Sequence, residues 1–212
     1  TLEEFACVAN PSPDIVYVAA LVDGDLVELT MPVQRDMDVQ MIAMSDQDGM
    51  RIYRRSLIFL LVAAVRRLFP GSRLDVHHSM TFGGLYCHLE ARPPFSVEEL
   101  TAVKQLMLDM VAQDLPIRRE EMPIENAIAE FHARGDEEKA SLLAQSTKKT
   151  VAIYQLGQAR DHFHGYMVPS TGYLRWFDLV PYSDGFVLHY PRRHAPTVLQ
   201  PFTPAPRVAQ VF

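Results

Sequence analysis

The sequence predicts an α+β protein that consists of a small N-terminal module and a larger second unit. Three observations lead to this fold class. The first 50 residues combine a short capped helix with patterns of short strands. A long, mostly apolar helix follows, from Tyr53 to Phe69. Beyond it, strand patterns and amphipathic helix patterns succeed one another along the chain, so both kinds of element share one core.

The N-terminal module, residues 1–50, opens with the capping-box spacing Thr1-Leu-Glu-Glu4, which predicts a helix from Leu2 to Ala9. Asp23-Gly24 predicts a tight hairpin turn. Asp46-Gln-Asp-Gly49 predicts a second turn. The strands expected around these turns are Ile15–Leu21, Asp25–Thr30 and Asp38–Met44. So short a module needs a neighbour, or residues missing from it, to be stable.

The second unit, residues 51–195, is expected to form around the helix from Tyr53 to Phe69, which ends at Pro70-Gly71. A second capping box, Ser96-Val-Glu-Glu99, predicts a helix that extends to Asp114. The other predicted helices are Ile124–Ala133 and Asp136–Gln145. The predicted strands are Arg73–His78, Leu85–Ala91, Ile117–Met122, Val151–Leu156, Tyr173–Leu179 and Phe186–Tyr190. The proline-rich residues 196–212 are expected to be an extended linker.

Composition excludes several classes of protein. A net charge of −6 argues against a general nucleic-acid binder, although a local basic patch stays compatible with it. Cys7 and Cys87 are too few for a disulfide framework, which favours a reduced, cytoplasmic protein. The longest apolar run, Leu57–Val65, is far shorter than the roughly 20 residues of a membrane span, so no membrane partner is expected. Because the chain begins at Thr1, we expect it to be a piece of a longer protein.

Residue chemistry alone names no reaction and predicts no catalytic residue. Eight histidines raise the question of a metal, with His77-His78, His88 and His162-x-His164 as candidates. No carboxylate or thiol stands at a diagnostic spacing from them, so structural histidines are the alternative and no metal is predicted. Paired basic residues could contact phosphates or could simply be solvated; they stand at positions 54–55, 66–67, 118–119, 148–149 and 192–193.

A resemblance to a known family rests on several separated motifs. They are Arg67-Leu-Phe-Pro70, Phe82-Gly-Gly-Leu-Tyr86, Pro94-Phe-Ser-Val-Glu-Glu-Leu100, Asp114-Leu-Pro-Ile-Arg-Arg-Glu-Glu121 and Val168-Pro-Ser-Thr-Gly172. From Tyr53 to about Pro196 the chain resembles the second additional domain of threonyl-tRNA synthetases, an editing domain that is also related to one in alanyl-tRNA synthetases. The segment from Ile15 to about Gly49 then resembles the end of a TGS domain, a β-grasp module. The resemblance implies that its first hairpin is missing ahead of Thr1.

In that family, deacylation depends on a His-x-x-x-His and a Cys-x-x-x-His motif. The matching positions here hold Arg55 and Phe59, then Phe163 and Met167. Phenylalanine and methionine cannot move a proton as histidine does, and neither offers the imidazole ligand of the motif. The resemblance therefore implies a dismantled editing site and no catalytic residue.

A second resemblance is to bacterial nucleoside kinase (uridine kinase-like) proteins. It rests on Tyr53-Arg-Arg-Ser56, His78-Ser79, Gly84-Leu-Tyr-Cys87, Gly165-Tyr-Met-Val-Pro-Ser-Thr-Gly-Tyr173, Phe177-Asp-Leu179 and Gly185-Phe-Val-Leu-His-Tyr-Pro-Arg192. It implies a non-catalytic, accessory N-terminal region whose missing partner is a P-loop kinase domain beyond Phe212. That domain would use ATP and magnesium to phosphorylate a nucleoside such as uridine. This chain, which has no phosphate-binding loop, would need no cofactor.

Two alternatives stay open beside the kinase hypothesis. The chain could be a free-standing editing-domain relative that binds or deacylates mischarged tRNA, with a site rebuilt from histidines, or it could be a pure RNA-binding module. Any functional cleft is expected between the central helix and the Gly165–Gly172 loop. Arg55 could bind an anion there, or it could only cap or salt-bridge the helix start. The residues expected at a cleft for a small molecule or tRNA are Arg55, His78, His162, His164 and Tyr166. An oligomer is also possible.

Overall fold

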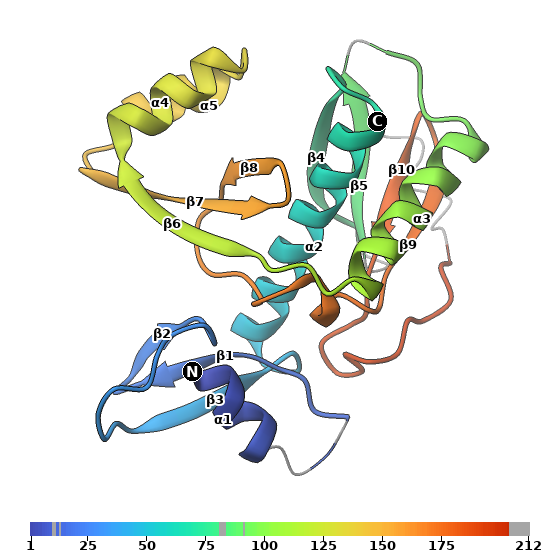
Figure 1. Ribbon diagram of the computed structural model, residues 1–212. Coiled ribbons are helices and arrows are strands. Elements are labelled where there is room, and N and C mark those ends of the chain that lie inside the picture. Colours follow the sequence, from blue (N-terminus) through green and yellow to red (C-terminus); the bar gives the residue numbers. More distant parts are fainter. Residues whose placement is uncertain (10–11, 13, 81–83, 91, 204–212) are drawn as a thin grey trace.

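The computed structural model describes residues 1–9, 12, 14–80, 84–90 and 92–203, without the side chains of residues 78–80. This part of the chain is a mixture of helices and antiparallel sheets, as the predicted α+β class requires (Figure 1). The helices are α1 (Leu2–Ala9), α2 (Gln47–Leu68), α3 (Val97–Ala112), α4 (Ile124–Ala133), α5 (Glu137–Ala144) and the short 3-10 helix η1 (Thr171–Tyr173). The strands are β1 (Tyr17–Val22), β2 (Asp25–Val27), β3 (Val39–Ala43), β4 (Arg73–Met80), β5 (Gly84–Glu90), β6 (Arg118–Pro123), β7 (Thr150–Leu156), β8 (Ala159–His162), β9 (Asp178–Tyr182) and β10 (Gly185–His189).

The N-terminal module is a three-stranded sheet in the order β2-β1-β3, with α1 packed against it. The predicted hairpin is confirmed, because Asp23 and Gly24 adopt φ of 51° and 92° and join β1 to β2. The central strand β1 is buried on both faces. Ala20 packs with Leu2 of α1, whereas the adjacent residue on the opposite face, Ala19, belongs to the main core. The module is therefore held by its neighbour, as its small size requires.

Helix α2 begins at Gln47, so the turn predicted at residues 46–49 and the predicted helix start at Tyr53 are wrong. Asp46 occupies the N-cap position, and its carboxylate accepts a hydrogen bond from the Ala43 amide at 2.8 Å. Gly49 lies in the first turn, where a Cβ atom would come within 1.8 Å of the Ala43 carbonyl oxygen. The glycine therefore serves close packing of helix on strand.

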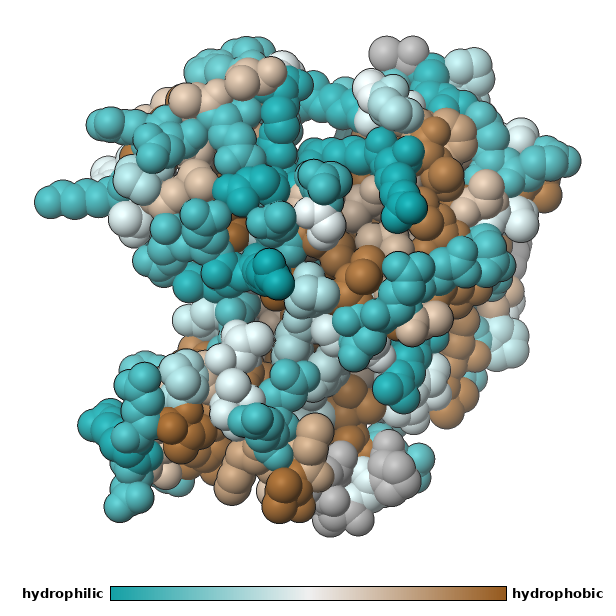
Figure 2. Space-filling model, viewed as in Figure 1, coloured by the Kyte–Doolittle hydropathy of each residue, from teal (hydrophilic) through white to brown (hydrophobic). Residues whose placement is uncertain are grey.

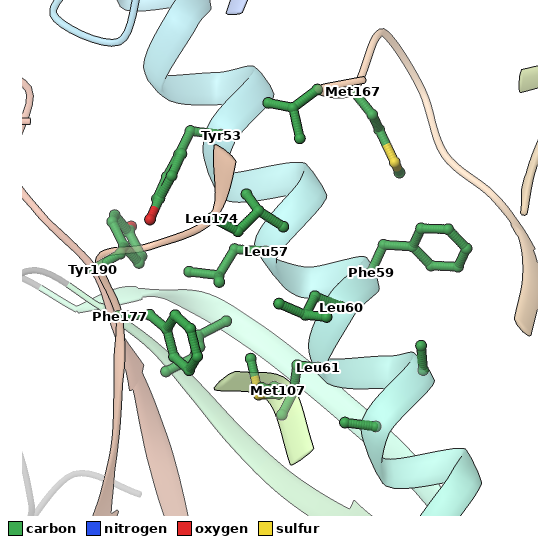
Figure 3. Packing of buried hydrophobic residues seen from close by; sticks show 14 of the residues in the cluster. Tyr53, Leu57, Phe59, Leu60, Leu61, Met107, Met167, Leu174, Phe177 and Tyr190 are labelled. Atoms are coloured by element: carbon green, nitrogen blue, oxygen red, sulfur yellow. The ribbon is translucent and has the colours of Figure 1, made fainter. Parts of the chain in front are cut away.

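Helix α2 runs through the middle of the molecule and contacts elements of all three sheets (Figure 1). Leu57, Phe59, Leu60 and Leu61 are fully buried, in agreement with the predicted central helix. Figure 3 shows Phe59 and Met167 on one side of the helix and Tyr53 and Phe177 on the other. On that second side the core continues into α3 and the four-stranded sheet β4-β5-β10-β9.

The third sheet, in the order β6-β7-β8, carries α4 and α5 and includes a strand that the sequence does not reveal. Strand β8 follows a turn at Gly157, which has a φ of 57°. It is polar, yet Asp161 in it is only 1% exposed. The carboxylate is paired with Arg66 of α2 at 3.1 Å and with Lys139 of α5 at 2.6 Å. Its polar sequence therefore reflects ion pairing instead of apolar packing.

The predicted strand Tyr173–Leu179 is also wrong: η1 occupies its start, and β9 begins only at Asp178. In between, the backbone of Trp176 is hydrogen-bonded by a side chain. The hydroxyl of Tyr53 accepts from the Trp176 amide at 3.0 Å and donates to the Trp176 carbonyl at 2.7 Å. These backbone groups therefore have partners without a neighbouring strand.

The boundary expected between residues 50 and 51 falls within the first turns of α2, and residues before and after it share one core. The division into two domains stays a prediction. Some of the predictions fall on residues that the structure does not describe. These residues are Phe82 and Gly83 of the motif Phe82–Tyr86, Ala91 at the end of the strand predicted for Leu85–Ala91, and 204–212 of the expected linker. Residues 191–203 contain no helix or strand.

Hydrophilic residues cover most of the surface of α4 and α5 in Figure 2. None of the helices that the structure describes has both the length and the apolar character needed to cross a membrane.

Candidate functional site

The four positions that match the editing motifs lie together where residues 163–167 pass along α2. Arg55 donates a hydrogen bond through Nη1 to the carbonyl oxygen of Tyr166 at 2.6 Å. The rings of Phe59 and Phe163 pack at a tilt of 60°, with their centroids 5.4 Å apart. Met167 is 1% exposed and belongs to the same core. The four side chains therefore hold the segment against the helix.

The Arg55 guanidinium lies directly over Gly165. A Cβ atom on this glycine would come within 2.9 Å of Arg55 Nη2, and its φ of +90° disfavours any other residue. Burial lowers the pKa of Arg55, but an arginine of this kind keeps its charge at neutral pH. Arg55 thus neither caps the helix start nor faces an open cavity.

A second layer fixes the same segment to the N-terminal module. The hydroxyl of Tyr154 donates to Glu28 Oε1 at 2.6 Å and lies 3.1 Å from the Gly165 carbonyl oxygen. The Met167 amide donates to the same Glu28 oxygen at 3.2 Å. Burial raises the pKa of Tyr154, so the phenol stays protonated and keeps donating. Sequence reasoning missed Glu28 and Tyr154, because neither belongs to a motif.

The expected space between α2 and the Gly165–Gly172 loop is closed by hydrogen bonds. Ser56 Oγ accepts from the Val168 amide at 3.0 Å. Thr171 Oγ1 accepts from the Leu115 amide at 2.8 Å, and the Thr171 amide donates back to the Leu115 carbonyl at 2.9 Å. These hydrogen bonds hold the loop against the residues that follow α3. The expectation of a cleft between helix and loop is therefore wrong, because the loop's own backbone needs these partners.

A cleft of about 620 Å³ lies beside this segment instead. Residues 162–166 form one wall, and the other walls come from β6, from the start of β7, and from the end of α5 with the residues after it. Of the five expected cleft residues, His162, His164 and Tyr166 line it, while Arg55 does not. The fifth, His78, has its backbone in β4 of a different sheet, and its side chain lies outside the described part of the chain.

Cationic and aromatic groups line this cleft. Lys148 and Arg119 come from two of the basic pairs seen in the sequence. Arg119 pairs with Glu121 at 2.7 Å and lies 5.7 Å from the centroid of the Tyr166 ring. A cation held against an aromatic ring can bind a phosphate while the ring offers a stacking face.

His162 adds a neutral imidazole to the cleft. Its Nδ1 lies 2.9 Å from the Ala152 carbonyl oxygen, and because a carbonyl only accepts, Nδ1 carries the proton. Nε2 is then left as an acceptor. Burial lowers the pKa of His162, which favours this neutral form. The His164 ring packs edge-on against it, with centroids 4.8 Å apart.

Comparisons with known proteins give the chain its context. It matches no protein-family model. It is 31% identical over 170 residues to the threonine–tRNA ligase of Laribacter hongkongensis, covering 80% of this chain and 27% of the ligase. It is 31% identical over 187 residues to the threonine–tRNA ligases of Methylococcus capsulatus and an Azoarcus species, covering 88% of this chain and 29% of each ligase. The chain is related to threonine–tRNA ligases.

This finding corrects the kinase resemblance. The relatives are tRNA ligases and not uridine kinase-like proteins, so the expectation of a nucleoside-kinase parent is wrong, and the expected kinase partner that would use ATP and magnesium has no support. The kinase resemblance rests on separated short motifs, whereas the similarity to the ligases is an alignment over 80–88% of the chain. The chain spans less than a third of the length of the relatives it matches. It is therefore a region related to a tRNA synthetase, consistent with an accessory role.

Proposed function

We propose that this chain is a non-hydrolytic relative of a synthetase editing domain and that its cleft binds the acceptor end of a tRNA. The observation that carries the proposal is the cleft itself. One of its walls, residues 162–166, contains part of the segment in which the editing motif has been replaced. The similarity to threonine–tRNA ligases makes tRNA the first ligand to test.

The side chains at the four motif positions argue against hydrolysis. Removing an amino acid from tRNA by hydrolysis requires a group that activates water, either a base or a metal ion. Phe59 and Met167 are buried and apolar, and Arg55 is engaged by a main-chain carbonyl. None of these three side chains, as they are placed, can therefore serve as that base.

The chemistry of the cleft suits a single-stranded nucleic-acid end. A volume of about 620 Å³ falls in the usual range for ligand pockets, about 300–1,000 Å³. Lys148 supplies a cation for phosphate beside the Arg119–Glu121 ion pair, and Tyr166 and His164 supply rings on which a base can stack. The net charge of −6 does not oppose this, because cations gathered at one site govern the local field.

Binding can be measured by fluorescence anisotropy with labelled threonine-specific tRNA over a series of salt concentrations. The wild type should bind. Lys148→Ala should weaken binding and reduce the slope of log K against log salt by about 0.7–0.9, the loss of one phosphate contact. Lys149→Ala is the matched control, because this neighbouring lysine does not line the cleft. Absence of binding at low salt, or equal losses in both variants, would contradict the proposal.

His162 supports a second candidate function, deacylation through a rebuilt site. Its imidazole is neutral, has a fixed tautomer and faces the cleft, as a general base requires. The assay is the release of the amino acid from mischarged threonine tRNA. We expect no release above background. Release that disappears in His162→Ala, but persists in the control His132→Ala on α4, would favour deacylation over simple binding.

A further inference from the structure

A cluster of metal-binding side chains lies on β4 and β5, in a different sheet from the cleft. Asp75 of β4 pairs directly with His88 of β5, and His77 follows Asp75 by two residues. His77 Nε2 is 2.9 Å from His88 Nδ1 and 3.4 Å from Asp75 Oδ2. All three ligand atoms lie within 4.8 Å of one another. Two imidazole nitrogens and a carboxylate oxygen thus meet at one point on the surface of the sheet.

These separations are compatible with binding of one metal ion. A Zn–N bond is about 2.0–2.1 Å long, so two ligands on one ion lie roughly 2.9 Å apart at a right angle and roughly 3.4 Å apart at a tetrahedral angle. The distance from His77 Nε2 to Asp75 Oδ2, 3.4 Å, equals the tetrahedral value. The distance from His77 Nε2 to His88 Nδ1, 2.9 Å, equals the right-angle value and is also the length of an ordinary hydrogen bond. A donor set of two imidazoles and one carboxylate suits zinc and its neighbours in the first transition series.

We propose that Asp75, His77 and His88 bind one divalent transition-metal ion, with zinc as the expected occupant. The ion would bind Asp75 Oδ2, His77 Nε2 and His88 Nδ1. The side chains of Asp75 and His77 are 42% and 38% exposed, so solvent or a further ligand can complete the coordination. The site differs from the editing-type positions, which lie on α2 and residues 163–167.

Neighbouring groups hold the imidazoles in place. The rings of His77 and His88 stack with centroids 4.8 Å apart, and the Tyr86 ring stacks on His77 at 5.8 Å. The Tyr86 hydroxyl in turn donates to Asp184 in the turn between β9 and β10. Side chains already ordered in this way lose little freedom when an ion binds, which strengthens binding.

The other explanation for the short nitrogen–nitrogen distance is a proton shared between the two rings. A hydrogen bond from one imidazole to the other would give the same 2.9 Å separation without any ion. Metal titration separates the two cases, because a hydrogen-bonded pair with no capacity for metal would bind none. The sequence offered both histidines as candidates, but Asp75 was missed because only strand pairing brings it and His77 beside His88.

The test is isothermal titration calorimetry of the whole chain, freed of metal by a chelator and titrated with Zn²⁺. We expect one equivalent of tight binding in the wild type. His88→Ala and Asp75→Asn should each weaken it by at least about tenfold. His132→Ala and His162→Ala, at histidines outside the cluster, should leave it unchanged. Far-UV circular dichroism of each variant verifies that it is folded.

Two results would overturn the proposal. One is a wild type that takes up no zinc, which would assign the pair to a shared proton. The other is binding that survives in His88→Ala but is lost in His162→Ala, which would place the ion in the cleft. As an independent measurement, Zn²⁺ should raise the melting temperature of the wild type and of His132→Ala, but not that of His88→Ala.

Discussion

Replacing Gly49 with alanine tests how closely α2 packs on β3. Helix propensity alone predicts that Gly49→Ala stabilises the protein by about 1 kcal/mol, because the residue lies within a helix. The structure predicts the opposite. The new Cβ atom would come within 1.8 Å of the Ala43 carbonyl oxygen and 2.6 Å of its carbon, and both atoms are backbone. The two elements must then separate by roughly 1.5–2 Å to restore van der Waals contact.

Overpacking of this kind typically lowers the free energy of unfolding by about 1–3 kcal/mol, and backbone neighbours cannot rotate away, so the upper end applies. After the gain in helix propensity we expect a net loss of about 2 kcal/mol. For a chain of this size the loss corresponds to a melting temperature lower by about 4–8 °C.

Urea unfolding followed by circular dichroism measures the change. Gly71→Ala is the control, because Gly71 has a φ of +83° but open space around its Cβ position, so it tests backbone strain without a clash. We expect it to lose only about 1 kcal/mol. A Gly49→Ala protein at least as stable as the wild type would refute the packing of α2 on β3.

Three further predictions follow from buried polar groups. Asp161→Asn removes the charge that holds Arg66 and Lys139; since both cations can turn to solvent, the free energy of unfolding should fall by only about 1–3 kcal/mol, measured by urea unfolding. Tyr154→Phe removes a hydrogen bond to a carboxylate and should lose about 1.5–3 kcal/mol in the same assay, whereas a neutral result would show that Glu28 does not anchor the segment. Burial lowers the pKa of His162 in the folded protein, so the unfolded chain binds a proton more readily. The contribution of the neutral His162 to the free energy of unfolding is therefore fully present above about pH 6.5 and is lost as the pH decreases below it. Between pH 7 and 5.5, His162→Asn should therefore lose less stability than the wild type, and equal losses would contradict this assignment.

The sequence correctly predicted those elements whose stabilising contacts lie between residues that are close together in the sequence. The capping box at Ser96 is present in full: the Ser96 hydroxyl accepts from the Glu99 amide at 3.2 Å, and the Glu99 carboxylate accepts from the Ser96 amide at 3.0 Å. The Asp23-Gly24 hairpin and the helix from Leu2 to Ala9 were predicted for the same reason. In each case the signal and its partner lie within a few residues of each other.

Elements that depend on distant partners were beyond sequence reasoning. The sequence of β8 is polar and does not indicate a strand. The cations that balance the charge of Asp161, Arg66 and Lys139, come from α2 and α5, which are distant in the sequence. The sequence around Trp176 has the pattern of a strand. No residue near it in the sequence indicates that the hydroxyl of Tyr53 forms hydrogen bonds with its backbone. The cleft is a similar case. Its histidines could be proposed from the sequence, but its position depends on how α5 and β6 meet residues 162–166.

The contact between Phe59 and Phe163 has a consequence for the chain's evolutionary history. Polar functional sites generally lower a protein's stability, so apolar replacements at such positions tend to strengthen the core. Replacing Phe59 with histidine would place an imidazole against the Phe163 ring, in an apolar contact where an unsatisfied polar group is destabilising. An exchange at one of these positions alone therefore lowers stability, which favours keeping the apolar side chains of this contact together.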